Sequence, residues 1–255
     1  MSNTETKKEE IETYDETEST RPSYGSLWDT DHYKQLIEDG PEAAFKQNLE
    51  SAPGNKRVLF IGVGEGKHAG EFSDLHPSSD ITGIELSHNR LKNTKEKYGR
   101  ALTLARADGE DLPFDADSFD IVVAHAVLHH LPNWNTDGLD EIERVLAEGG
   151  RFVFYEPGRF NPPAVFRRRY IPSEIHTPGE KPFNPKELLS VLEQKFSTVE
   201  MEGHCLISHT LPVIDNYTPF SIPYRVTKRI YSAERILFDR IDSRLAWIFT
   251  GYAEV

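Results

Sequence analysis

Cysteine is almost absent from this sequence, since Cys205 is the only one among 255 residues. One thiol excludes a disulfide within the chain and any metal centre built from several cysteines. Long hydrophobic runs are missing too: the longest, residues 121–128, is interrupted by His125 and is far too short to cross a bilayer. The first residues also lack the apolar core of a signal peptide. Together these absences predict a protein of the reducing cytoplasm.

Positive charge is scarce as well, because 29 lysines and arginines face 42 acids, a net charge of −13. Phosphate backbones attract basic surfaces, so this balance argues against nucleic acid as a partner. The first twenty residues hold seven acids, two lysines and few apolar side chains. We therefore expect residues 1–20 to be a disordered acidic tail. Residues 21–255 are long enough for one α/β domain with additions.

Short apolar runs alternate with helical patterns from residue 57 onward, which is typical of a doubly wound α/β sheet with parallel strands. Their nearly continuous Val, Ile, Leu and Phe indicate strands buried on both faces. The expected strands are residues 57–61, 80–85, 101–106, 119–124 and 151–156. The expected helices are two short ones within 21–56 that form an N-terminal cover, further ones near Gly66, after the N-caps Ser87 and Asn184, and those over 136–148 and 224–244.

Three glycines and two acids follow these strands in order. Gly62, Gly64 and Gly66 end the first expected strand, Glu85 ends the second and Asp108 follows the third. Ligands of such sheets bind beyond the carboxyl ends of the strands, where bare backbone lets a ligand approach closely. We interpret Glu85 as the acceptor for a ribose diol and Asp108 as the acceptor for the amine of a base. The expected cofactor contacts are Gly62, Val63, Gly64, Glu65, Gly66, Glu85, Leu86, Asp108, Gly109, His125 and Ala126.

A dinucleotide site is the alternative interpretation of the glycines. Residues 64–69 fit the GxGxxG/A pattern, and Glu85 lies about twenty residues further on, as a ribose-binding acid would. An NAD(P)-dependent oxidoreductase is therefore compatible with this spacing. Residues 107–114 favour methyl transfer instead, because a dinucleotide site has no standard need for an acid at Asp108.

Residues 57–160 resemble the class I S-adenosylmethionine-dependent methyltransferases, closest to the branch with the ubiquinone and menaquinone biosynthesis enzymes. The segments that carry the resemblance are 58–66, 83–87, 107–114, 119–131 and 141–152. It implies a Rossmann-like sheet of seven strands, with strand six near 196–205 and an antiparallel strand seven near 246–254. It also implies S-adenosyl-L-methionine as cofactor and methyl transfer to a small molecule. Residues 157–183 and 208–245 would be insertions near the substrate.

One position departs from that family. The family usually has an acid where Phe60 stands, and that acid helps to hold the amino-acid end of the cofactor. Glu65 is a candidate to compensate, and Val63, in place of a common cysteine, is a neutral change. The departure leaves open a second hypothesis, a catalytically inactive binding or regulatory protein on the same fold.

Candidate catalytic groups follow strands four and five. His129 and His130 are suited to act as a general base near neutral pH, and Glu156 is a second candidate. We expect no metal site, because His125, His129 and His130 share one short loop with no acid at ligand spacing. Oxygen, nitrogen and carbon acceptors are all compatible with this arrangement.

The expected helix over 224–244 carries more basic than acidic residues. Ile230, Leu237 and Ile241 would share its buried face. A lid that meets a membrane surface is one interpretation. An ordinary helix with a solvated basic face explains the same pattern and is favoured.

Overall fold

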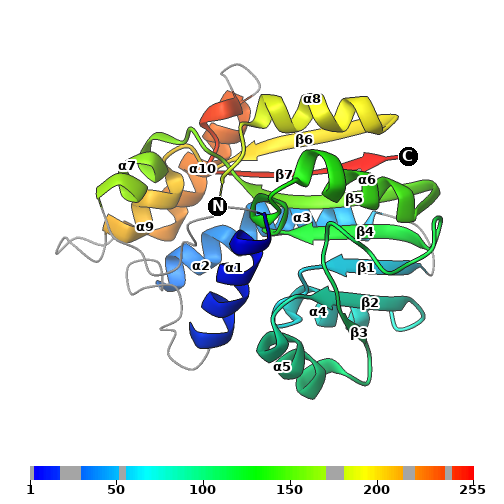
Figure 1. The fold of residues 1–255 in the computed structure, drawn as a ribbon. Coiled ribbons are helices and arrows are strands. Elements are labelled where there is room, and N and C mark those ends of the chain that lie inside the picture. The colour runs from blue at the N-terminus through cyan, green and yellow to red at the C-terminus, as the bar shows by residue number, and fades with distance from the viewer. Residues whose placement is uncertain (1–2, 18–29, 52–55, 171–180, 215–221, 239–242) are drawn as a thin grey trace.

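The computed structural model describes residues 3–17, 30–51, 56–170, 181–214, 222–238 and 243–255. Seven strands form one sheet in the order β3-β2-β1-β4-β5-β7-β6 (Figure 1). Only β7 runs antiparallel to its neighbours, β5 and β6, so the predicted Rossmann-like sheet is confirmed. The strands are β1 Arg57–Ile61, β2 Asp80–Glu85, β3 Thr103–Arg106, β4 Phe119–His125, β5 Leu146–Pro157, β6 Thr198–His204 and β7 Ile248–Glu254.

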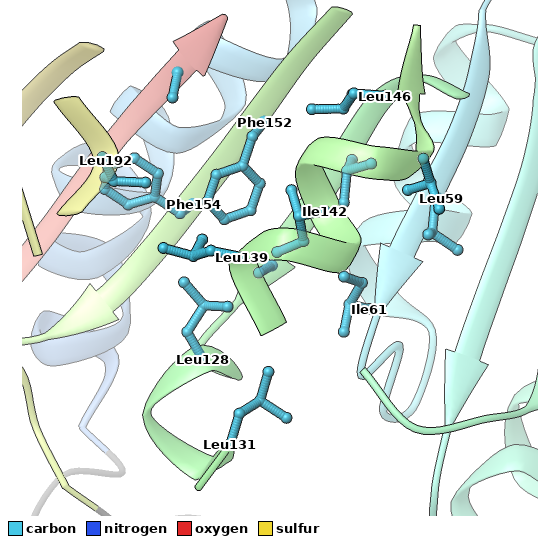
Figure 2. Close-up of a cluster of buried hydrophobic side chains, with 14 of the residues drawn as sticks. Leu59, Ile61, Leu128, Leu131, Leu139, Ile142, Leu146, Phe152, Phe154 and Leu192 are labelled. Carbon is cyan, nitrogen blue, oxygen red and sulfur yellow. The ribbon is translucent and has the colours of Figure 1, made fainter. Parts of the chain in front are cut away.

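Helices cover both faces of this sheet. On one face, α3 (Pro41–Glu50) packs against β5 and β7, while α4 (Lys67–Leu75) and α5 (His88–Tyr98) pack near β2 and β3. On the other face, α6 (Leu139–Val145) and α8 (Pro185–Lys195) bury their apolar stripes against β4 and β5. Figure 2 shows Leu139 and Ile142 of α6 among the side chains of this second core, next to Phe152 and Phe154 of β5. The sheet is thus buried on both sides, as its apolar strands require.

Local capping residues begin two of these helices as predicted. The Ser87 hydroxyl accepts a hydrogen bond from the Arg90 N–H at 3.2 Å, and the Asn184 side chain accepts from the Lys186 N–H at 3.3 Å. The helix expected over 136–148 differs, because a π-helical turn (η2, Trp134–Gly138) precedes α6 and α6 ends at Val145. Leu146 already pairs with β4, so strand pairing ends the helix early.

The N-terminal segment differs from the expected disordered tail. Residues Asn3–Thr17 form helix α1, while residues 18–20 lie outside the described part. Charged contacts hold α1: Lys7 pairs with Asp108 and Glu110, and Asp15 accepts a hydrogen bond from the Ser87 hydroxyl at 2.5 Å. A rule that counts apolar side chains alone does not see such contacts.

The remaining helices lie with α1 around the ends of the strands (Figure 1). They are α2 (Asp31–Asp39), α7 (Pro162–Tyr170), α9 (Leu211–Ile214), α10 (Tyr224–Phe238) and the short turns η1 (Leu128–His130), η3 (Ser208–Thr210) and η4 (Ser243–Leu245). Helices α2 and α3 are the two expected short helices before the sheet. None of the described helices is long and apolar enough to cross a membrane.

Helix α10 buries a different face from the one predicted. Leu237 is 40% exposed, and the buried side chains are Thr227, Tyr231 and Glu234; Ile241 lies outside the described residues. Both Glu234 carboxylate oxygens accept backbone N–H bonds from the loop after β6, at 2.7–3.1 Å. Tyr231 shares a hydrogen bond with the ring of His204 at 2.8 Å. Apolar periodicity failed here because polar bonds attach α10 to the sheet.

Candidate functional site

The glycine turn after β1 is an open backbone surface. Gly62, Gly64 and Gly66 all have positive φ angles, which favour glycine. A Cβ atom on Gly62 would stand 2.6 Å from a methyl group of Val127, whereas one on Gly64 would meet nothing closer than 3.9 Å. Gly64 therefore borders free space at the carboxyl end of β1. A ligand can approach its main chain there.

Glu85 joins this turn to the end of β2. One carboxylate oxygen accepts the Gly64 N–H and the other accepts the Ser87 N–H, both at 3.0 Å. The residue is only 7% exposed, so these bonds fix its position. A carboxylate has about four acceptor sites, which leaves capacity for two further donors such as vicinal hydroxyls.

Asp108 stands next to α1. One of its oxygens accepts the Glu110 N–H at 3.0 Å, and the other accepts the ammonium of Lys7 at 2.6 Å. Burial works to lower the pKa of Lys7, but the bonds to Asp108 and Glu110 outweigh it and the pKa rises. No local pattern indicates this contact, because Lys7 lies 101 residues before Asp108, in the expected tail. The Lys7 ammonium is thus bonded to the carboxylate that we predicted to accept a hydrogen bond from the nucleobase of the cofactor.

The end of β4 presents two surfaces. Ala126 has a positive φ of 54°, unusual for a residue with a side chain, and its N–H donates to the Tyr155 carbonyl at 2.7 Å. The His125 ring lies against α3, where Nε2 shares a hydrogen bond with Glu42 Oε1 at 2.9 Å. The predicted cofactor contact of residues 125–126 would therefore use their backbone, since the His125 ring is bonded to Glu42.

A buried histidine–carboxylate pair follows β4. His129 Nδ1 lies 2.6 Å from Glu156 Oε2, and both side chains are shielded from solvent. The other Glu156 oxygen accepts the Val127 and Leu128 N–H groups at 3.0 and 2.8 Å. The His130 ring lies 4.1 Å from the His129 ring. Two of the three predicted catalytic candidates therefore form one unit.

Phe60 is part of the core rather than of the site. It is 4% exposed, and its ring lies 6.3 Å from that of Phe72. Glu65 points into solvent from the glycine turn. Phe60 therefore occupies the position where the family that this chain resembles usually has an acid.

Comparison with known proteins gives a consistent relationship. Residues 59–154 match the family described as "Methyltransferase domain". Malonyl-[acyl-carrier protein] O-methyltransferase of Geobacter sulfurreducens is 32% identical over 123 residues, covering 48% of this chain and 44% of that protein. Phthiotriol/phenolphthiotriol dimycocerosates methyltransferase of Mycobacterium tuberculosis is 37% identical over 103 residues, covering 40% and 37%. The chain thus spans less than half the length of these relatives.

Solved structures share the fold at low sequence identity. Phosphoethanolamine N-methyltransferase 2 of Haemonchus contortus, in complex with S-adenosyl-L-methionine, superposes with a TM-score of 0.61 at 18% identity, covering 94% of this chain and 59% of that one. The [4+2]-cyclase SpnF gives 0.59 at 16% identity, covering 92% and 87%. A cyclase among these neighbours shows that the fold alone does not fix the reaction.

Proposed function

Because residues 59–154 are a methyltransferase domain of the class I S-adenosylmethionine-dependent family, we propose that this protein transfers a methyl group from S-adenosyl-L-methionine to a small molecule. The position of Glu85 is the observation on which the proposal rests. Its carboxylate is fixed beside Gly64, where the backbone borders free space. Bare main chain next to an acceptor for a ribose diol fits this cofactor, and Asp108 supplies an acceptor for the adenine amine.

The protein's own contribution to the reaction is positioning and proton transfer. The bound cofactor supplies an electrophilic methyl group on a sulfonium, so alignment and exclusion of water give much of the rate. Glu156 accepts a hydrogen bond from His129 Nδ1 and thereby fixes the ring and its tautomer. Nε2 then keeps the lone pair that takes the proton from an acceptor O–H or N–H. Glu156 acts through His129 and is a positioning residue.

Apolar side chains around α7 suggest an acceptor with an apolar part. Phe160, Val165 and Phe166 are each at least 39% exposed, and Ile207 is 47% exposed. The relatives named for malonyl-acyl carrier protein and for dimycocerosates support the same class. We therefore infer a small amphiphilic acceptor. The net charge of −13 separately argues against nucleic acid as a partner.

Incubation with isotopically labelled cofactor and a metabolite extract tests the proposal. We expect mass spectrometry to detect a labelled product with the wild-type chain and none with the Glu85→Ala variant. The inactive-protein hypothesis, motivated by Phe60, predicts no product and no heat on calorimetric titration with S-adenosylhomocysteine at millimolar concentration. That pair of results would replace methyl transfer by the alternative.

A further inference from the structure

Three possible metal ligands meet where α3, α4 and β4 come together. Glu42 comes from α3, His68 from the first turn of α4 and His125 from the end of β4. One nitrogen or oxygen atom of each lies within 4.8 Å of the others. His129 belongs to the separate pair with Glu156, so this group shares only His125 with the loop that the sequence brought to attention.

Two polar atoms of the group face each other without a hydrogen-bond partner among the described residues. Glu42 Oε2 and His68 Nδ1 are both inaccessible to solvent and lie 3.9 Å apart, too far for a hydrogen bond. A buried polar atom without a partner is costly, so such atoms in a native protein call for an unseen occupant. Two such atoms facing each other mark where that occupant sits.

The spacing suits a small cation. Zinc bonds to nitrogen and oxygen are about 2.0–2.2 Å long, which places tetrahedral ligand atoms about 3.3–3.6 Å apart. The 3.9 Å separation of Glu42 Oε2 and His68 Nδ1 closes to that distance with a small side-chain movement. The 2.9 Å hydrogen bond between Glu42 and His125 would give way to bonds with the ion.

Acids outside the group partly offset the two lysines nearest to it. Lys67 pairs with Glu38 at 2.7 Å, and Lys46 pairs with Glu71 at 3.0 Å. These ion pairs reduce the repulsion that the two lysines exert on a cation beside His68. Aromatic rings enclose the other side, since Phe45 and Tyr155 pack on the His125 ring at 4.9 and 4.2 Å.

We propose that Glu42, His68 and His125 bind a divalent transition-metal ion such as Zn²⁺, with one ligand position left for water. Two imidazoles and a carboxylate are a ligand set suited to this class of ion. The ion fastens α3 of the N-terminal cover to the helix that follows the glycine turn and to the end of β4. It stabilises the elements that surround the cofactor site, without itself taking part in methyl transfer.

Metal titration of the full chain tests this site. The protein carries no histidine tag, is stripped with a chelator, and is titrated with Co²⁺, whose visible absorption reports tetrahedral coordination, and then with Zn²⁺ in competition. We expect one ion per chain and a rise in Tm on adding Zn²⁺. Glu42→Gln and His68→Gln should each weaken binding at least about tenfold. His88→Gln, at an exposed position outside the group, should bind as the wild type does.

Circular dichroism checks that each variant is folded, and the Co²⁺ spectrum of the wild type decides even if a variant is not. Absence of a saturable tetrahedral Co²⁺ signal in the wild type would overturn the proposal. Equal affinity in a folded His68→Gln variant would overturn it too. If Glu42→Gln weakens cofactor binding while the wild type binds no metal, the group holds the cofactor's amino-acid end instead.

Discussion

Two backbone N–H groups hold the carboxylate of Glu85 in place. Replacing it with Gln removes the negative charge and turns amide N–H donors toward the Gly64 or Ser87 N–H. Hydrogen bonds to a charged group contribute about 1.5–3 kcal/mol each, so we expect the Kd for S-adenosylhomocysteine to rise at least about tenfold. Calorimetry measures this. Glu96→Gln, on the exposed face of α5, is the matched control, and equal loss in both variants would show a nonspecific charge effect.

The buried pair after β4 makes a separate prediction about catalysis. His129→Asn removes the proposed base, and general base catalysis contributes about 10²–10⁴-fold, so kcat should fall by at least about a hundredfold. Cofactor affinity should stay near that of the wild type. His130→Asn is the comparison, because the Glu156 carboxylate is hydrogen-bonded to the ring of His129. An equal fall in kcat for the two variants would contradict the assignment, as would unchanged activity of His129→Asn.

At the scale of elements, α1 bears on cofactor affinity. The proposed function has Asp108 accept a hydrogen bond from the adenine amine, and the Lys7 ammonium already lies 2.6 Å from Asp108 Oδ2. We expect the two donors to compete there. Lys7→Ala removes the competitor, and we expect the Kd for S-adenosylhomocysteine to fall by about two- to fivefold, which corresponds to the roughly 0.4–1 kcal/mol of an ion pair near the surface. Lys8→Ala is the control, because Lys8 is exposed and its ion pair with Glu12 lies within α1. Weaker binding by Lys7→Ala would show that α1 holds the cofactor rather than competing with it.

The elements also show what the sequence could predict. Ser87 and Asn184 begin α5 and α8 as predicted, since capping depends on residues within one turn. The early end of α6 depends on Leu146 pairing with β4, and pairing partners distant in the chain leave no local signal. The approach of Glu42 to His125 is of the same kind. The strand pattern did predict that Glu85 lies beside the glycine turn, because the topology of the sheet brings the carboxyl ends of parallel strands together.

Across the whole molecule, buried neutral histidines make stability sensitive to acid. Burial, followed by the charge of Arg235, lowers the pKa of His204 to about 3, and burial lowers that of His68 equally far. Unfolded histidine has a pKa near 6.5, so between about pH 6.5 and pH 3 the unfolded state binds more protons than the native state. The free energy of unfolding is therefore highest above about pH 6.5 and decreases as the pH falls through this window. Glu42, with its pKa lowered to about 2, acts in the same direction below about pH 4.5.

Urea unfolding of the metal-free protein at several pH values between 7.5 and 5 measures this sensitivity. Each buried histidine contributes a slope of about 1 kcal/mol per pH unit once the pH is below its unfolded pKa. His204→Gln removes one titrating group, and its lost hydrogen bonds to Tyr231 and Thr250 lower stability at every pH. The slope of unfolding free energy against pH should nevertheless decrease by about 1 kcal/mol per pH unit, the contribution of one proton. The exposed variant His88→Gln should leave this slope unchanged. If the dependence of unfolding free energy on pH is the same with and without His204, this histidine takes up its proton in the native state. Its hydrogen bonds, rather than its neutrality, would then be what attaches α10 to the sheet.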